Sequence, residues 1–212
     1  MSYPSLDLEA ELLETYDLVI GVDEVGRGAL AGPVAVGAIG ITKDHLDSLP
    51  KGVRDSKLVP EQKRDAIADL ISDWAKFEVG YSSVHAIETQ GITRALKMAA
   101  IAAIKPLVSG NCIVLLDGSQ NWLSDAVLDA EVTLRVKADR DHGSVSAAAL
   151  MAKVSRDNQM RELHLQHPEY DWQSNKGYAS NSHIAALQSL GPTEHHRLSW
   201  LTKILSEQNS LF

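Results

Sequence analysis

Two short apolar runs end in acidic residues, and this pattern constrains the fold more than any other feature of the chain. Residues 18–22 are followed directly by Asp23 and Glu24, and residues 113–116 by Asp117. Continuous apolar runs of this length are typical of strands that are buried on both faces. Because sites in open α/β sheets gather where strands leave the core, we expect the carboxylates at the two strand ends to converge.

A third carboxylate position follows another predicted strand, over residues 132–136. Asp139 comes just after this strand, and Asp141 competes for the same role. Clustered carboxylates repel one another unless a cation neutralises them. Carboxylate oxygens without Cys ligands or paired-His spacing favour Mg²⁺ or Mn²⁺, and two such ions can assist phosphodiester hydrolysis.

The remaining pattern predicts an α/β protein in which helices flank a mixed sheet. Further strands are predicted at residues 33–41 and 77–83. The predicted helices span residues 6–15 (with Ser5 as N-cap), 60–74, 86–107 (weakest at Gly91), 145–164, 182–190 and 193–207. We divide the chain into an N-terminal helix (1–17), a core (18–170), a small helical C-terminal subdomain (171–207) and a tail (208–212).

The charge of the chain is unevenly distributed. The 212 residues hold 28 acids and 20 bases, a net charge of −8, which argues against a strongly basic, histone-like nucleic-acid binder. The first 24 residues, however, hold seven of the acids and none of the bases. We therefore predict that the acidic N-terminal helix lies away from an anionic substrate.

Cysteine content and hydropathy predict a cytoplasmic protein. Cys112, the single cysteine, lies in an apolar run typical of a buried structural thiol, so no disulfide can form within the chain. The first residues do not resemble a signal peptide. No window approaches the ~18 apolar residues of a membrane span.

A glycine-rich segment after the first strand leaves two interpretations open. Gly26, Gly28 and Ala31 fit the spacing of a dinucleotide-binding fingerprint, with Asp44 or Asp47 further along. That fingerprint must open a helix, whereas the residues after Pro33 indicate a strand. We therefore favour glycines that let backbone N–H groups approach a ligand closely.

Seven motifs in chain order resemble one known family, the type 2 ribonucleases H and specifically bacterial ribonuclease HII. They run over residues 18–200 and are Asp23-Glu24-Val25-Gly26-Arg27-Gly28, Asp55-Ser56-Lys57, Leu116-Asp117-Gly118, Val136-Lys137-Ala138-Asp139, residues 146–157, Asn175-Lys176-Gly177-Tyr178 and His196-Arg197-Leu198-Ser199.

The resemblance implies an RNase H-like fold and a metal-dependent endoribonuclease. Its substrates would be RNA/DNA hybrids and single ribonucleotides embedded in duplex DNA, as in ribonucleotide excision repair, and its products would carry 5′-phosphate and 3′-hydroxyl ends. The metal ligands and catalytic residues would be Asp23, Glu24, Asp117 and Asp139, with Asp139 preferred to Asp141 by its match to the family motif. The Mg²⁺ or Mn²⁺ ions would activate water and stabilise the leaving 3′-oxygen.

The resemblance also implies how the substrate is recognised. Residues Gly26, Arg27 and Gly28 would contact the ribonucleotide's 2′-hydroxyl and the adjacent phosphate, and Tyr178 would pack against the junction nucleotide. Bases near the motifs are predicted to neutralise phosphates. These bases are Lys57, Lys137, Lys153, Arg156 and Lys176.

Two features near the C-terminus complete the sequence-based predictions. For His183 and the adjacent His195 and His196, structural hydrogen bonding is favoured over metal binding. In the tail, Gln208, Leu211 and Phe212 resemble the short peptide with which bacterial proteins bind the replication sliding clamp, the alternative being a frayed end. A monomer is expected, and the rival functions are an oxidoreductase and a non-catalytic hybrid-binding or clamp-associated module.

Overall fold

A mixed sheet forms the centre of the computed structural model, which describes residues 3–124, 126 and 128–206. Within these residues the sheet has five strands in the order β3-β2-β1-β4-β5. β1 pairs with β2, and β2 with β3, in antiparallel fashion, whereas β1–β4 and β4–β5 are parallel. The strands are β1 (Leu18–Val25), β2 (Val34–Ile41), β3 (Phe77–Ser82), β4 (Cys112–Asp117) and β5 (Glu131–Arg135).

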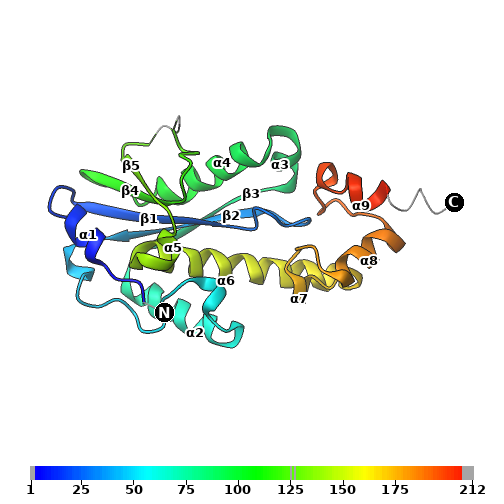
Figure 1. The fold of residues 1–212 in the computed structure, drawn as a ribbon, viewed down its shortest axis with the longest axis horizontal. Helices are drawn as coiled ribbons and strands as arrows, with labels where there is room; N and C mark the ends of the chain where they lie inside the picture. Colours follow the sequence, from blue (N-terminus) through cyan, green and yellow to red (C-terminus); the bar gives the residue numbers. More distant parts are fainter. Residues whose placement is uncertain (1–2, 125, 127, 207–212) are drawn as a thin grey trace.

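Two layers of helices enclose the sheet, which explains why its central strands are continuously apolar. The helices α3 (Val84–Gln90) and α4 (Ile92–Ile104) cover one face, and α2 (Glu61–Trp74) and α6 (Gly143–Gln166) cover the other (Figure 1). All eight residues of β2 are buried as a result. The prediction of a mixed sheet flanked by helices is confirmed.

Small residues let α6 lie close against the sheet. A Cβ added to Gly37 of β2 would stand 2.3 Å from the carbonyl oxygen of Ala148, so a side chain at residue 37 would displace the helix. At this contact Ala148 presents its backbone carbonyl and Ala152 its methyl group. This close packing fixes α6 relative to the ends of β1 and β2.

The predicted helix over residues 86–107 is divided in two. Gly91 has a φ of 81°, which ends α3 and begins α4 one residue later. The weak point predicted at Gly91 is thus a helix boundary, because this left-handed φ interrupts the helical hydrogen-bond ladder.

The predicted helix over residues 193–207 is wrong for the described residues, which contain only a short 3₁₀ turn (Leu198–Trp200) and α9 (Thr202–Ser206). Residues 195–197 pair instead with the glycine-rich loop after β1. Gly32 N–H donates to His195 O at 2.8 Å, and Arg197 N–H donates to Leu30 O at 2.8 Å. Backbone groups used in this pairing cannot form helical hydrogen bonds.

A third apolar cluster joins the C-terminal helices to the end of α6. The helices α7 (Trp172–Asn175) and α8 (Asn181–Leu190) lie beyond the ends of β1 and β2 (Figure 1). Trp172, Leu187 and Leu201 are buried there together with Met160 of α6. The proposed four-part division of the chain stays a prediction.

The N-terminal helix is shorter than predicted, and Ser5 precedes the N-cap position, although its Oγ accepts a hydrogen bond from Asp7 N–H at 3.4 Å. It runs over α1 (Asp7–Leu12), with Leu6 at the N-cap position and no side-chain cap hydrogen bond. The backbone of Ser5 pairs instead with residues 141–143. In the described part of the chain, no helix combines the length and apolarity that a bilayer crossing requires.

Candidate active site

The acidic residues predicted to form a site lie on neighbouring elements. In the parallel pair β1–β4, Val22 is level with Leu116, so Asp23 and Asp117 follow at the same end of the sheet. Asp139 belongs to α5 (Ala138–Asp141), and the N–H of Ala138 donates to Asp117 Oδ1 at 2.7 Å. This hydrogen bond ties the segment that carries Asp139 to the end of β4.

Electrostatic interactions show that these carboxylates act on one another. Burial raises the pKa of Asp23 well above its usual value, and the charges of Glu24 and Asp117 raise it further. Burial also raises the pKa of Glu24, against the opposing effect of Arg27. For Asp117, burial and then the charge of Asp139 raise the pKa. An arrangement that disfavours its own negative charge favours a bound cation.

The donor set fits a hard divalent cation, although the side chains are not yet arranged around one. Among the described residues, no three His, Cys, Asp or Glu side chains converge on a common metal position. Bases pair with two of the carboxylates: Arg27 Nη1 lies 3.3 Å from Glu24 Oε1, and Lys57 Nζ lies 3.2 Å from Asp139 Oδ2. Carboxylate oxygens alone are the ligands that Mg²⁺ and Mn²⁺ prefer.

The other candidate carboxylate, Asp141, is directed to a different partner. Its two oxygens accept hydrogen bonds from the guanidinium of Arg140 at 2.7 and 2.8 Å. Asp139, in contrast, acts electrostatically on both Asp23 and Asp117. The geometry therefore favours Asp139 over Asp141 as the fourth carboxylate of the site.

The glycine-rich loop runs from β1 to β2, which excludes the dinucleotide-binding interpretation. β2 is an antiparallel strand and not the helix that the fingerprint requires. Gly26 has a φ of 81°, and its N–H donates to the hydroxyl of Tyr178 at 3.1 Å. Gly28 has open space where a Cβ would point. The loop thus lies between the carboxylates and the ring of Tyr178.

Two buried arginines hold this loop in place. Arg197 donates to the carbonyl oxygens of Gly26 at 2.7 Å and Arg27 at 2.9 Å, and Arg156 donates to those of Ala31 at 3.0 Å and Pro33 at 2.8 Å. Burial and then the charge of Arg156 lower the pKa of Arg197 to about 10. Sequence reasoning assigned no role to Arg197; its only signal was its place in a family motif.

A pocket of about 360 Å³ opens between the carboxylates, the loop and Tyr178. Tyr178 is 36% exposed, and the guanidinium of Arg156 lies 5.5 Å from its ring centroid. A smaller pocket of about 240 Å³ shares Glu24 and Arg27 with the first and extends to Asp117 and Trp122. The larger of the two is lined by Asp23, Glu24, Val25, Gly26, Arg27, Gly28, Ser56, Lys57, Ala149, Lys153 and Tyr178.

Four of the five predicted phosphate-binding bases fall into two groups, and the fifth, Lys137, is exposed at the N-cap of α5. The side chains of Lys57 and Lys153 line the 360 Å³ pocket, where that of Lys57 is 78% exposed. Lys176 is only 5% exposed and pairs with Glu61 at 2.9 Å, so its prediction as a substrate contact is corrected to a structural ion pair. Arg156 is corrected to a structural residue as well, because its guanidinium is fully buried and donates to backbone carbonyl oxygens. Both are held by partners distant in the chain, Glu61 for Lys176 and the carbonyl oxygens of residues 31 and 33 for Arg156, which spacing along the chain does not reveal.

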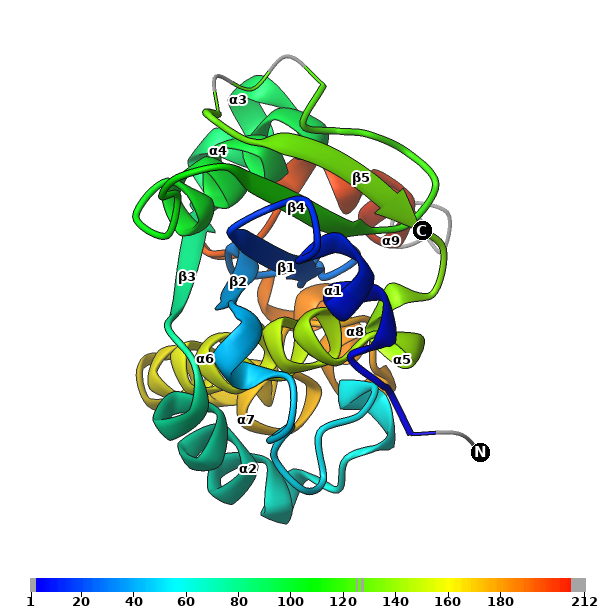
Figure 2. The same cartoon turned by 90° about the vertical axis from the view of Figure 1, so that its left-hand side faces the viewer.

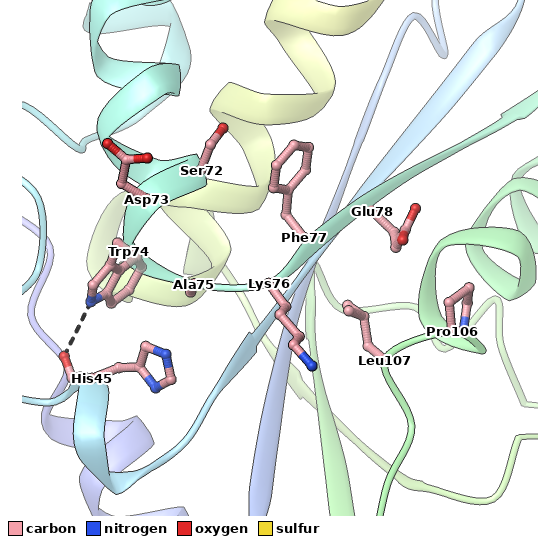
Figure 3. A pocket seen from close by; sticks show the side chains of 10 residues that line it. All are labelled: His45, Ser72, Asp73, Trp74, Ala75, Lys76, Phe77, Glu78, Pro106 and Leu107. Atoms are coloured by element: carbon pink, nitrogen blue, oxygen red, sulfur yellow. Dashed lines mark hydrogen bonds between the residues drawn. The ribbon is translucent and has the colours of Figure 1, made fainter.

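Another pocket, of about 470 Å³, surrounds the start of β3 (Figure 3). The strand pairing places it at the end of the sheet opposite the carboxylates. It is formed where α2 ends and β3 begins, with Trp74 Nε1 donating to His45 O at 3.4 Å. Lys76 and Glu78 lie at its rim, and none of the predicted site residues is among its lining. Size alone therefore does not identify the site.

The histidines and the cysteine have the structural roles that the sequence predicted. His183 Nδ1 lies 2.9 Å from Tyr178 O, and its Nε2 lies 3.1 Å from His196 Nε2, whose Nδ1 accepts from Thr193 N–H at 2.9 Å. Cys112 is buried and its thiol contacts a backbone carbonyl at 3.4 Å. The tail residues Gln208, Leu211 and Phe212 lie outside the described residues.

Solved structures with this fold are type 2 and type 3 ribonucleases H. The ribonuclease H2 of Pyrococcus horikoshii superimposes with a TM-score of 0.73 at 22% identity, covering 91% of this chain and 99% of that one. The RNase HII of Archaeoglobus fulgidus, solved in complex with PCNA, gives 0.72 at 24% identity, covering 86% and 95%. Bst-RNase HIII, solved with Mn²⁺, gives 0.71 at 18% identity, covering 94% and 72%. The fold is therefore that of the RNase H-like class.

Sequence similarity narrows the class to one family. A model of the family described as Ribonuclease HII matches residues 20–203. A ribonuclease HII from Wolbachia of Brugia malayi is 39% identical over the full length of both chains, and one from Roseobacter denitrificans is 42% identical over 84% of this chain and 87% of its own. The chain belongs to the ribonuclease HII family and is a type 2 ribonuclease H.

Proposed function

We propose that this enzyme cleaves duplex DNA at single embedded ribonucleotides as well as RNA in longer hybrids, leaving 5′-phosphate and 3′-hydroxyl ends. The observation that carries the proposal is the pocket in which Gly26, Gly28 and Tyr178 face Asp23 and Glu24. Two glycines that lack a Cβ, together with an aromatic ring and neighbouring carboxylates, suit one nucleotide held against the scissile phosphate. Contact with the 2′-hydroxyl would distinguish RNA from DNA.

The four carboxylates are proposed as the catalytic metal ligands. Asp23, Glu24, Asp117 and Asp139 supply only oxygen donors, and the Mn²⁺ complex of a neighbour in fold supports Mg²⁺ or Mn²⁺ as the cofactor. A bound divalent cation would stabilise the charge that develops on the phosphate and on the leaving 3′-oxygen. Closing the ligand set requires Arg27 and Lys57 to release Glu24 and Asp139, which frees both bases for substrate phosphates.

The remaining pocket residues are proposed to bind and orient the substrate. Arg27 and Lys57 reach into the opening and would neutralise phosphates next to the cleaved bond. Lys153 is less available, because its ammonium lies 2.6 Å from Asp157. Tyr178 would stack on the nucleotide at the RNA–DNA junction, its hydroxyl held by the N–H of Gly26.

The tail is proposed to bind the replication sliding clamp. Gln208, Leu211 and Phe212 match the spacing of a clamp-binding peptide, and a neighbour in fold was solved in complex with PCNA. We expect deletion of residues 208–212 to abolish binding to the clamp in a pull-down while leaving cleavage of a short duplex unchanged. Equal binding by the shortened chain would remove the proposal. The enzyme is proposed to act as a monomer in the cytoplasm.

A single assay tests the proposed activity. The substrate is a DNA duplex with one ribonucleotide, and Mg²⁺ and Mn²⁺ are supplied separately. We expect cleavage with at least one metal, and a loss of more than ~100-fold in Asp23→Asn and Asp117→Asn, because each removes a ligand charge. Binding of the duplex without cleavage would instead indicate the non-catalytic module, and full activity of either variant would overturn the ligand assignment.

A further inference from the structure

Asp139 differs from the other carboxylates of the site because it lies outside the sheet. It belongs to α5, a helix of only four residues between β5 and α6. Contacts with other elements must therefore fix its position. Two of them are on the site side: Ala138 N–H donates to Asp117 Oδ1, and Ser146 Oγ donates to Asp139 O, both at 2.7 Å.

Further contacts come from the N-terminal segment, which lies beside α5 (Figure 2). Ser5 N–H donates to Asp141 O at 3.2 Å, and Gly143 N–H donates to Ser5 O at 2.7 Å. Residues 5 and 142 thus form a parallel bridge across the turn between α5 and α6. The N-terminal segment is thus part of the framework that carries Asp139, although none of its residues lines the two pockets at the carboxylates.

Glu9 is the unexpected residue of this segment. Its side chain is fully buried, although it belongs to the acidic helix α1. Oε1 accepts hydrogen bonds from Ser144 N–H at 2.8 Å and Ser144 Oγ at 2.7 Å, while Oε2 is buried without a hydrogen-bond partner. The N-terminal end of the long helix α6 carries the positive end of the helix dipole, which offsets part of the cost of burying this carboxylate.

Ser144 connects this contact to the strand that bears Asp23. A Cβ added to Gly21 of β1 would stand 2.5 Å from Ser144 Oγ, so the serine lies directly against the backbone of β1. Gly21 precedes Asp23 by two residues, and Ser144 follows Asp139 by five. A shift of Ser144 would therefore change the position of α5 relative to β1.

We propose that Glu9 is a positioning residue for the metal centre, which it serves by holding Ser144 and hence the α5–α6 junction that carries Asp139. This inference rests on the proposed function, since it assumes that Asp139 is a metal ligand. Glu9 itself touches neither substrate nor metal. Its contribution is to fix the distance between Asp139 and the three carboxylates on β1 and β4.

The test measures Mn²⁺ binding by titration calorimetry, together with the Mg²⁺ concentration that gives half-maximal cleavage. We expect Glu9→Ala to weaken Mn²⁺ binding by ~10-fold, a typical effect of removing a partner behind metal ligands. Glu9→Gln keeps an acceptor oxygen and is expected to restore most of the affinity. Glu11→Ala is the matched control, because Glu11 is exposed on the same helix, and is expected to leave binding unchanged.

General loss of stability is separated from positioning by a second control. Ile104→Ala removes a buried side chain from α4 on the other face of the sheet, and is expected to lower the melting temperature without altering Mn²⁺ affinity. Ser144→Ala removes one of the two hydrogen bonds and serves if Glu9→Ala does not fold; a smaller loss of affinity is expected.

The outcomes distinguish this inference from the proposed function. A wild-type enzyme that neither binds Mn²⁺ nor cleaves its substrate would overturn the proposed function. If the wild type does both, unchanged Mn²⁺ affinity in folded Glu9→Ala, or in Ser144→Ala, would overturn the positioning role alone. The positioning role is also overturned if Ile104→Ala weakens Mn²⁺ binding as much as Glu9→Ala does.

Discussion

Gly26 and Gly28 are two residues apart, yet the structure demands glycine only at the first. Gly26 has a φ of 81°, and an added Cβ would stand 2.2 Å from Arg156 Nε, whereas Gly28 has nothing within 4 Å of that position. We expect Gly26→Ala to lower the free energy of unfolding by ~2 kcal/mol or more through backbone strain and this clash. Gly28→Ala is the control, with an expected change below ~1 kcal/mol. Urea unfolding measures both; equal losses would contradict the argument.

Lys57 has an exposed side chain, so its effect should be on substrate binding and not on stability. Burial lowers its pKa, but the charges of Asp139 and Asp55 outweigh this and leave the pKa raised, so the side chain is charged at neutral pH. We expect Lys57→Ala to raise KM. We also expect the slope of log binding affinity against log salt concentration to fall by about one, the value of a single phosphate contact. Lys43→Ala, which removes an exposed lysine paired with Glu14, should change neither. An unchanged salt slope in Lys57→Ala would exclude the phosphate contact.

At the scale of single residues, the sequence predicts well which side chains stand at strand ends. It predicts poorly which charged side chains are buried. Asp23 and Asp117 are predictable because each follows an apolar run. The sequence pattern places Lys176 at the substrate and Glu9 in an acidic helix, but it does not reveal that both side chains are buried. Their burial depends on elements more than 100 residues away, Glu61 for Lys176 and Ser144 for Glu9, and local pattern does not record such contacts.

At the scale of elements, the glycine-rich loop depends on the C-terminal segment that carries Arg197. This guanidinium bonds three carbonyl groups of the loop and lies 4.9 Å from the ring of Trp200. Lysine cannot reproduce the planar set of donors. We expect Arg197→Lys to destabilise the fold by about 3 kcal/mol and to raise KM, because buried carbonyls lose partners and the loop loses its position.

The matched control for this prediction is Arg140→Lys. Arg140 is half exposed and pairs with its neighbour Asp141, so the expected change is within ~0.5 kcal/mol. Thermal unfolding and steady-state kinetics measure both variants. Similar melting temperatures for the two would show that Arg197 does not hold the loop.

The strands could be predicted from the sequence and the C-terminal elements could not, because only the strands are determined by local sequence. Apolar runs such as residues 113–116 reflect burial on both faces, which local sequence records directly. Residues 195–197 have a sequence compatible with a helix, but their backbone pairs with residues 30–32. Pairing with a distant loop overrides local propensity, so the error lies where tertiary contacts replace local ones.

At the scale of the whole molecule, the net charge of −8 conceals two separate functions of the acids. One group, at the ends of β1 and β4 and on α5, forms the site where a cation is proposed to bind. Another lies in α1, where Glu9 is buried and Glu11 is exposed. An acidic total is therefore compatible with an anionic substrate, because the exposed bases Arg27 and Lys57 lie at the pocket itself.

The free energy of unfolding of the whole fold depends on pH. The buried histidines His183 and His196 are expected to make the protein less stable as the pH falls. Burial and then the charge of His183 lower the pKa of His196 to about 4, and burial lowers that of His183. The unfolded chain, with a pKa near 6.5, therefore takes up protons that the folded protein does not. The stabilising contribution is complete above about pH 6.5 and is lost as the pH falls towards 4.

His196→Gln tests this contribution, because the pH dependence of other groups cancels when the variant is compared with the wild type at each pH. Asp23 and Asp117 have raised pKa values, so their protonation stabilises the fold as the pH falls. Both residues are present in the variant and in the wild type, so their effect cancels. We expect the wild-type advantage in urea unfolding to shrink by about 2 kcal/mol between pH 7 and pH 4.5. His85→Gln, at an exposed histidine, should show no such trend. An advantage that stays constant or grows on acidification would mean that His196 is protonated in the folded protein.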